Sequence, residues 1–390
     1  MRDGWVETTL DGIAEYINGY PFKPSDLGEV GLPVIRIKQL LDPNEPVDRT
    51  ETDTPDKCLL RDGDIIFSWS GTIAVRIWNR GPAKLNQHLF KVTEKKGVYK
   101  GIIPLILDHA IEELEEKSHG TTMKHITKQT LLPHKVLLPP LPEQKRIVDL
   151  ISSVDSYIEA LQQQLESAKS SRNAVLHELL TTGGDDWVET TLGEVVSVVN
   201  GGTPSTKSED YWGGSIVWIT TTELTAFDGK RVNSSKRTIT ADGLRNGPAR
   251  LVRAGTTLVG TTATIGTCAL ADCELTFNQQ ISGLIPLDKN LDDSYLFYWM
   301  QHIKSILEGL SAGTSFKRIS TSVLKTVSIN FPPIGEQRRI AAVISEMDEF
   351  IESIQRTSIE AKNLRSGLLS DLLIGDHEIP ASYDKVIGAA

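Results

Sequence analysis

The chain has 390 residues, 39% of them hydrophobic, so it can bury sizeable cores and should hold two or three domains rather than a disordered tail. Its formal net charge of −10 argues against an indiscriminate nucleic-acid binder, which is usually basic. No apolar run approaches the ~20 residues that span a bilayer, and MRDGWVETTL lacks signal-peptide features, so we expect a cytoplasmic protein.

Two globular blocks share short stretches that recur in the same order. Between these stretches the blocks differ markedly, as two related modules with different surfaces would. The shared stretches are WVETTL at 5–10 and 187–192, Asn-Gly at 18–19 and 200–201, β-rich runs from Gly63 and Gly255, Asn-Gln at 86–87 and 278–279, and GTTMKHIT at 120–127 with GTSFKRIS at 313–320. Each β-rich run is followed by a polar turn and the Asn-Gln pair, which predicts strands joined by a polar loop.

A long helix is expected after each block. Pro142 followed by Glu143 is typical of a helix start, and Gly183 or Gly375 marks an end. A helix over about 143–181 would be roughly 58 Å long, too long for an ordinary domain core. Its apolar positions recur in steps of four and three, which indicates a heptad seam. The seam residues are Ile147, Ile151, Val154, Ile158, Leu161, Leu165, Ala168, Arg172, Val175 and Leu179, repeated as Ile340, Ile344, Met347, Ile351, Ile354, Ser358, Ala361, Arg365, Leu368 and Leu372.

The duplication predicts that the two helices pair with each other. If they run antiparallel, the end of the second helix lies close to the N-terminal Trp5, which a parallel pairing would not achieve. We therefore expect an α+β protein with a pseudo-two-fold internal repeat, in which two globular α/β domains are separated by two long antiparallel helices that form an intramolecular coiled coil. The expected boundaries are 1–140 and 185–331 for the globular domains, 141–184 and 332–376 for the helices, and 377–390 for a tail.

Catalytic motifs are missing from the sequence. A methyltransferase that uses S-adenosylmethionine would need a glycine-rich strand-to-helix turn and an Asn/Asp-Pro-Pro-aromatic loop, and the nearest string, NFPPI from Asn330, has Phe331 interposed. Three cysteines form no CxxC pair, which predicts neither a disulfide framework nor a zinc site. We expect no catalytic residue, no metal and no cofactor.

Two further patterns favour structure over chemistry. Asp108, Glu115 and Lys117 loosely fit a metal-dependent nuclease pattern, but their carboxylates also fit the solvated face of a helix. His88, His125 and His302 have no repeated Cys or Asp partner, so each is expected to be structural or a hydrogen-bonding side chain.

The globular blocks are rich in short polar donors with scattered cations. Arg, Lys, Asn and Gln can read base edges, while Ser, Thr and backbone amides suit phosphates. The candidate DNA-binding residues are Arg36, Lys38, Gln39, Ser68, Ser70, Arg76, His88, Lys124 and His125 in the first block, and Thr203, Ser205, Thr220, Thr221, Thr222, Arg231, Lys236, Arg237, Thr261, Thr262, Thr264, Lys317 and Arg318 in the second.

Several of these strings together resemble a known family. WVETTLG, NGGTPS, YWGGSIVWIT, the TATIG turn followed by Asn-Gln, and above all PPLPEQKRI and PPIGEQRRI are similar to the specificity subunit of type I restriction-modification systems. The resemblance covers nearly the whole chain. The first block departs from the pattern, because GYPFKP replaces NGGTPS and SWSGTIAV lacks the Thr-Ile-Gly string.

The resemblance implies a non-catalytic protein with two target recognition domains, each reading one half of a split sequence in double-stranded DNA. It also implies that the long helices fix the spacing and dock two methylation subunits, with restriction subunits joining in the full complex. Because the blocks differ, the target should be asymmetric, and the gap between its halves should have a fixed length. The alternatives are a coiled-coil adaptor for proteins and a stand-alone enzyme that acts on nucleic acid.

Overall fold

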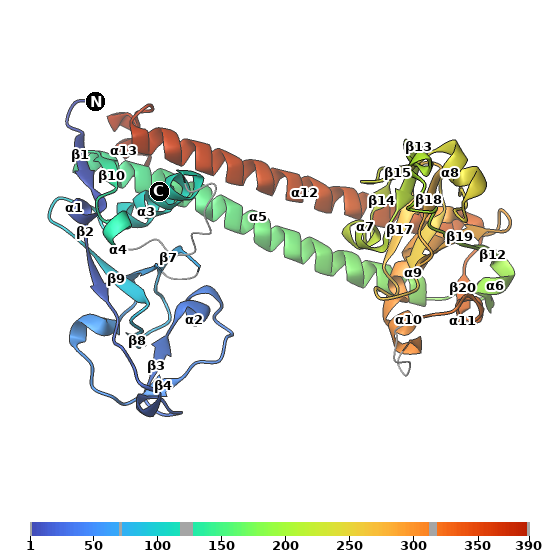
Figure 1. The fold of residues 1–390 in the computed structure, drawn as a ribbon, viewed down its shortest axis with the longest axis horizontal. Helices are drawn as coiled ribbons and strands as arrows, with labels where there is room; N and C mark the ends of the chain where they lie inside the picture. The colour runs from blue at the N-terminus through green and yellow to red at the C-terminus, as the bar shows by residue number, and fades with distance from the viewer. Residues whose placement is uncertain (1, 70–71, 118–127, 312–317, 388–390) are drawn as a thin grey trace. The chain divides into compact units, whose positions relative to one another are not determined.

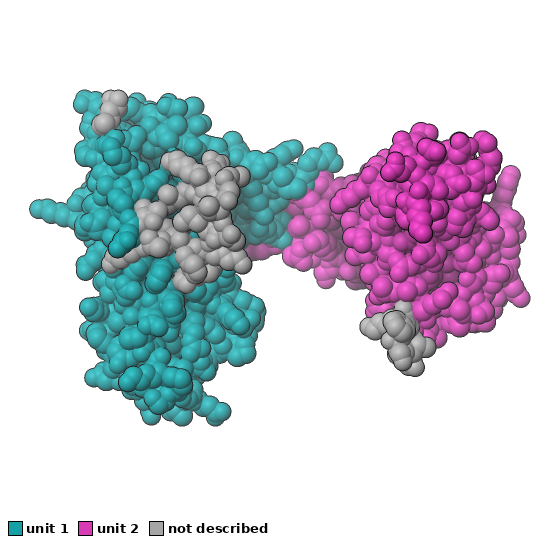
Figure 2. All heavy atoms as spheres, viewed as in Figure 1, with its two compact units in different colours: residues 1–162, 356–390 teal, residues 163–355 magenta. Residues whose placement is uncertain are grey.

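A computed structural model describes residues 2–69, 72–117, 128–311 and 318–387. The chain divides into two compact units (Figure 2): unit 1 is residues 1–162 and 356–390, and unit 2 is residues 163–355. Each unit therefore contains one β-rich globular part and one half of each long helix. Within the described ranges, no helix has the length and apolar character needed to cross a bilayer.

Unit 1 is built around two four-stranded sheets (Figure 1). The first sheet has the order β2-β9-β6-β7 and is antiparallel throughout. The second has the order β4-β3-β8-β5, with β3 and β8 parallel. The strands of unit 1 are β1 (Val6–Thr9), β2 (Ala14–Asn18), β3 (Leu32–Ile35), β4 (Arg49–Thr50), β5 (Leu59–Leu60), β6 (Ile65–Ser68), β7 (Ala74–Ile77), β8 (Ala83–Leu85), β9 (Leu89–Glu94) and β10 (Lys135–Leu138).

Unit 2 repeats this topology with a larger first sheet, ordered β12-β19-β16-β17-β14. Its second sheet has the order β15-β13-β18, and β13 and β18 are parallel like β3 and β8. A two-stranded ribbon closes each unit, β1 with β10 and β11 with β20. The strands are β11 (Val188–Thr191), β12 (Val196–Asn200), β13 (Trp212–Ile219), β14 (Arg231–Val232), β15 (Thr238–Ile239), β16 (Thr257–Gly260), β17 (Cys268–Ala271), β18 (Leu275–Phe277), β19 (Ile281–Pro286) and β20 (Ser328–Phe331). The predicted internal repeat is confirmed by this shared strand order.

Short helices connect the strands and cover the sheets. The longest of them, α3 and α9, occupy the same place in the element order of the two units, directly after β9 and β19. The helices are α1 (Leu10–Ile13), α2 (Ile37–Leu41), α3 (Ile102–Lys117), α4 (Lys128–Leu131), α6 (Leu192–Val195), α7 (Thr221–Ala226), α8 (Ala241–Asn246), α9 (Asp293–His302), α10 (Lys304–Leu310), α11 (Thr321–Lys325) and α13 (Asp384–Ile387).

The two long helices are α5 (Leu141–Thr181) and α12 (Ile334–Ile374), each of 41 residues. Every residue of the predicted seam is buried or half-buried. In unit 1, the start of α5 shares a core with the end of α12, through Ile147, Ile151 and Leu372. In unit 2, the end of α5 shares a core with the start of α12, through Leu180 and Ile340. The antiparallel pairing is therefore confirmed within each unit.

One arginine–aspartate ion pair joins the helices in each unit. Arg172 contacts Asp348 at 2.9 Å in unit 2, and Arg365 contacts Asp155 in unit 1. These are the arginines that interrupt the two apolar seams, and their partners are also related by the repeat. Arg172 is only 8% exposed, and its guanidinium also donates to Gln301. A buried charge needs such partners because desolvation is costly.

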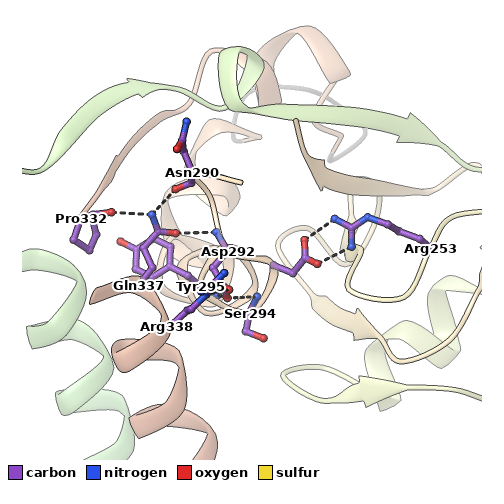
Figure 3. A network of polar contacts seen from close by, with 9 residues as sticks. Arg253, Asn290, Asp292, Ser294, Tyr295, Pro332, Gln337 and Arg338 are labelled. Atoms are coloured by element: carbon purple, nitrogen blue, oxygen red, sulfur yellow. Dashed lines mark hydrogen bonds and ion pairs between the residues drawn. The ribbon is translucent and has the colours of Figure 1, made fainter. Parts of the chain in front are cut away.

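A buried glutamine attaches each long helix to its globular part. Gln337 lies in the first turn of α12, where its Nε2 donates to the carbonyls of Asn290 and Pro332 and its Oε1 accepts the N–H of Asp292 (Figure 3). Gln144 does the same in α5: its Oε1 accepts the N–H of Tyr99, and its Nε2 donates to the carbonyls of Pro139 and Gly97. The glutamine of the repeated Glu-Gln motif is thus explained, because only an amide can both donate to these carbonyls and accept the N–H group.

The C-terminal segment folds back onto unit 1. Ile379 is buried in its core, and Arg146 binds Asp384 through two hydrogen bonds of 2.7 and 2.8 Å. This pairing raises the pKa of Arg146 and lowers that of Asp384. The backbone turns at Gly375, which has a φ of 83° and lies against Trp5. The expected proximity of the second helix end to Trp5 is confirmed.

The glutamine anchor yields a stability prediction. Gln337→Ala should lower the free energy of unfolding by about 2–4 kcal/mol, because one N–H and two carbonyls lose their partner in a buried site. Gln163→Ala is the matched control, since Gln163 is exposed on a long helix and should change stability by less than about 0.5 kcal/mol. Urea unfolding followed by circular dichroism measures both, and equal effects would contradict the anchoring role.

Candidate nucleic-acid interface

The same backbone frame carries the polar side chains in both units. In unit 1, the N–H of Asn86 donates to the carbonyl of Ile35 at the end of β3. In unit 2, the N–H of Asn278 donates to the carbonyl of Ile219 at the end of β13. Both asparagines are buried, and both precede an exposed glutamine. We call this region of each unit the polar edge: the end of β3 or β13, the residue that follows it, and the Asn-Gln turn.

The glycine of the repeated Asn-Gly pair packs against the Asn-Gln turn of the polar edge. A Cβ on Gly19 would lie 2.2 Å from the carbonyl oxygen of Asn86, and one on Gly201 would lie 2.1 Å from that of Asn278. Real Cβ atoms do not approach a carbonyl so closely, so only glycine lets the two segments meet. The frame is therefore constant, while the residues around it differ between the units.

In unit 1, Arg36 follows β3 and caps α2, and its guanidinium binds Asp48 at 2.7 Å. Lys38, Arg76 and His88 are exposed. Two other candidates point inward: Gln39 is buried and donates to the carbonyl of Pro46, and Ser68 is buried and donates to the carbonyl of Thr72. These two side chains hold loops together in this structure and are not free to contact a ligand.

In unit 2, Thr220 caps α7 in a capping box with Glu223. Glu223 is buried, and its carboxylate accepts the N–H groups of Thr220 and of Lys236. Burial alone would raise the pKa of Glu223, but the hydrogen bonds from Thr220 and Lys236 hold it below its ordinary value. The carboxylate thus fixes the loop that carries Lys236 and Arg237 beside the polar edge.

The remaining candidates of unit 2 fall into two groups. Thr221 is buried against Asn278 and Gln280, and Arg231 is paired with Asp272 at 3.1 Å, so both are engaged within the chain. Thr203 donates to the side chain of Gln279, which places the loop after β12 on the polar edge. Ser205, Thr222 and Lys236 are exposed.

The TATIG turn lies between β16 and β17. Thr261 is buried and donates to the carbonyl of Gln280, which joins the turn to the polar edge. Ala263 has a φ of 64°, a left-handed conformation that a non-glycine residue rarely adopts. Thr262 forms a bridge with the exposed Arg318, and the hydroxyl of Thr264 is buried with no hydrogen-bond partner among the described residues.

Some candidates lie outside the described residues, namely Ser70, Lys124, His125 and Lys317. Asp108 lies on α3, as the helical interpretation predicts, whereas nothing is described of the side chains of Glu115 and Lys117. His302 lies against His177, and burial together with this neighbour lowers its pKa. Over the described part of the chain, no group of three or more His, Cys, Asp or Glu residues is arranged to hold a metal ion.

Three residues in or near the polar edge of unit 2 are not among the candidates from the sequence. Gln279 follows the buried Asn278, and the repeated Asn-Gln pair was the available signal. Trp212 and Trp218 form an edge-to-face pair with ring centroids 4.9 Å apart, and Arg237 stacks on both. The sequence indicates the aromatic residues of this insert, but their contact with Arg237 depends on the pairing of β13 with β15.

A second candidate surface lies on the long helices. In unit 1, Val154, Tyr157 and Leu364 line a shallow hollow of about 580 Å³ over Ala361. In unit 2, Met347, Phe350 and Ser171 line a hollow of about 320 Å³ over Ala168. The residues correspond through the repeat, and Tyr157 and Phe350 are 52% and 50% exposed. Each unit thus presents an exposed aromatic ring beside an alanine on the helix pair.

Comparison with known proteins gives one consistent result. The model of the family described as type I restriction modification DNA specificity domain matches residues 2–169 and 184–363. The MjaIX specificity subunit of Methanocaldococcus jannaschii is 35% identical over 170 residues, which cover 43% of this chain and 39% of that protein. The EcoBI specificity subunit of Escherichia coli is 23% identical over 442 residues, covering 99% of this chain and 92% of the relative.

Solved structures share the fold. A chain from a study of complex assembly and conformational transition of the type I R-M system has a TM-score of 0.67 and 18% identity, covering 96% of this chain and 98% of that one. The S subunit of a type I restriction-modification system from M. genitalium has a TM-score of 0.57 and 13% identity, covering 95% of this chain and 96% of that one.

The capping carboxylate of unit 2 yields a pH prediction. Glu223→Gln should lower the free energy of unfolding at pH 7 by about 1–2 kcal/mol, because an amide is a weaker acceptor for the N–H groups of Thr220 and Lys236. The depressed pKa means that the charged form stabilises the fold fully above the ordinary pKa of glutamate, about 4.3. This contribution is lost as the pH falls through the lower pKa of the folded state.

The difference between parent and variant should therefore be present at pH 7 and decrease as the pH falls below the ordinary pKa of glutamate. Urea unfolding at neutral pH and at about pH 3 measures it. Glu209→Gln, at an exposed position in the same unit, is the control and should have little effect at either pH. A Glu223→Gln penalty that stays the same in acid would contradict this assignment.

Proposed function

Because this chain belongs to the type I restriction-modification DNA specificity family, we propose that it is a specificity subunit that recognises a bipartite, asymmetric target in double-stranded DNA. Its role is sequence recognition, and the complex that it joins supplies the catalysis. Residues 1–140 and 185–331 act as the two target recognition domains. DNA as the partner implies a cytoplasmic location.

The observation that carries the proposal is the constant frame with a variable polar edge. Asn86 and Asn278 hold equivalent turns in the two units. Around them, unit 1 presents Arg36, whereas unit 2 presents Thr220 and the stacked Arg237. Side chains on loops carried by a rigid scaffold are the usual means of binding, and base edges are read by individual side chains. Two unlike edges would read two unlike half-sites.

The helical segments 141–184 and 332–376 act as spacers between the half-sites. An α-helix rises about 1.5 Å per residue and is stiff when a partner buries its seam. The length of the helices would therefore set the distance between the two half-sites. Recognition should tolerate any sequence in the gap but not a changed gap length, as for other proteins that bind two half-sites. We take the segment 377–390 to be a tail, whose described part packs on unit 1 through Ile379 and Asp384.

The paired hollows on α5 and α12 would dock two copies of one methylation subunit. The hollow at Tyr157 and the hollow at Phe350 have matching residues, and equivalent surfaces bind equivalent partners. Exposed aromatic rings are the residues that most often anchor protein interfaces. Restriction subunits would join through this complex. A coiled-coil adaptor is disfavoured, because each long helix already buries its seam within the chain.

Exchange of one globular block tests the recognition of split targets. Replacing residues 196–331 with the corresponding block of another family member should change one half-site of the methylated motif and leave the other half-site and the gap unchanged. Methylome sequencing of cells that carry the parent or the chimera reads both halves directly. A motif that changes in both halves, or a parental motif without a gap, would overturn the proposal.

Substitution in the hollows tests the docking of two subunits. The parent chain should bind two methylation subunits at saturation, and Tyr157→Asp and Phe350→Asp should each leave only one, since a charge in the hollow cannot be buried against a partner. Ile359→Asp is the control, because Ile359 is 59% exposed on α12 but lines neither hollow. Native mass spectrometry counts the subunits. A parent complex with one methylation subunit at saturation contradicts the model.

A further inference from the structure

Arg237 is held in a fixed orientation by two tryptophans. Its guanidinium carbon lies 3.7 Å from the centroid of the Trp212 ring and 5.6 Å from that of Trp218. Both indole N–H groups are engaged, that of Trp218 with the carbonyl of Gly202 at 3.0 Å and that of Trp212 with the carbonyl of Ser205 at 3.1 Å. The rings are therefore fixed to the loop after β12, and they orient the arginine at the polar edge.

Among the described residues, no carboxylate pairs with Arg237, in contrast to three other arginines of unit 2. Arg231, Arg245 and Arg253 each form an ion pair with an aspartate. Within the described residues, no hydrogen bond or ion pair joins the Arg237 side chain to a carboxylate. Glu223, which binds the adjacent Lys236 N–H, uses its oxygens for that donor and for Thr220. The N–H groups of Arg237 are thus left for a ligand.

The chemistry of this arrangement favours a base edge. A stacked guanidinium loses little side-chain entropy on binding and presents two parallel N–H donors in its plane. These donors match the O6 and N7 acceptors of guanine in the major groove, which is the commonest specific contact between a cationic side chain and a base edge. We propose that Arg237 reads a guanine through two hydrogen bonds in the half-site bound by unit 2. This inference rests on the proposed function and specifies one base of the target.

At the position of unit 1 that corresponds to Arg237, the chain carries an aspartate instead of a stacked arginine. Asp48 lies directly before β4, as Arg237 lies directly before β15, and these strands pair with β3 and β13 in the same antiparallel way. Asp48 binds Arg36 at 2.7 Å. The arginine of unit 1 therefore follows β3, whereas the arginine of unit 2 precedes β15. The guanine read by Arg237 should therefore occur in one half-site only, at a position that unit 1 does not copy.

The test uses the chain assembled with its methylation subunits. The parental motif is first determined by methylome sequencing. Binding is then measured to duplexes in which each base pair of that motif is replaced in turn. Arg237→Lys keeps the charge but removes the fork and the flat stacking surface. Arg245→Lys is the matched control, because Arg245 is exposed in the same unit and paired with Asp242.

In the parent complex, one G·C pair of one half-site should be preferred by roughly 5- to 150-fold over its replacements. Arg237→Lys should lose this preference, while its preferences at all other positions stay within about twofold and Arg245→Lys behaves like the parent. Equal weakening on every duplex would mean a phosphate contact and overturns the inference, as does an unchanged preference. A parent complex that shows no bipartite motif overturns the proposed function and the inference together.

Discussion

The antiparallel contact between the long helices is the constraint on which the rest of the structure depends. Each helix carries an apolar seam over 41 residues, and such a helix is unstable in water unless a partner covers that seam. Arg172 interrupts the seam of α5, and it is tolerated there because Asp348 meets it from α12. Since the repeat places an arginine of one helix opposite an aspartate of the other in both units, antiparallel pairing supplies each unit with the same kind of ion pair.

A buried glutamine attaches the start of each long helix to its globular part. Gln144 and Gln337 bind backbone groups that belong both to the Pro-Pro lead-in of their helix and to the loop before α3 or α9. These loops continue into α3 and α9, and α9 supplies Tyr295 and Trp299 to the core that it shares with the start of α12. The orientation of a polar edge relative to its half of the helix pair is thus fixed by hydrogen bonds and by burial together.

A constant frame with variable surroundings suits a protein whose task is recognition. The frame is secured by main-chain bonds, by the two glycines that allow close approach, and by buried asparagines, none of which depends on the target. The residues that differ, such as Asp48 and Arg237, sit at the ends of short strands, where an exchange disturbs little of the core. This separation permits specificity to change while the fold persists.

The sequence by itself determined the duplication, the two long helices, their seams and their antiparallel pairing, because these follow from periodicity, start and stop signals and repeated residues. It also indicated where polar residues gather, through the Asn-Gln pair and the Thr-rich turns. Only the tertiary structure decided which candidates are free: Gln39, Ser68 and Thr221 are buried, while Arg237 lies open on two tryptophans. The physical reason is that hydrogen-bond partners and stacking come from segments far apart in the chain, and composition does not reveal which strands bring them together.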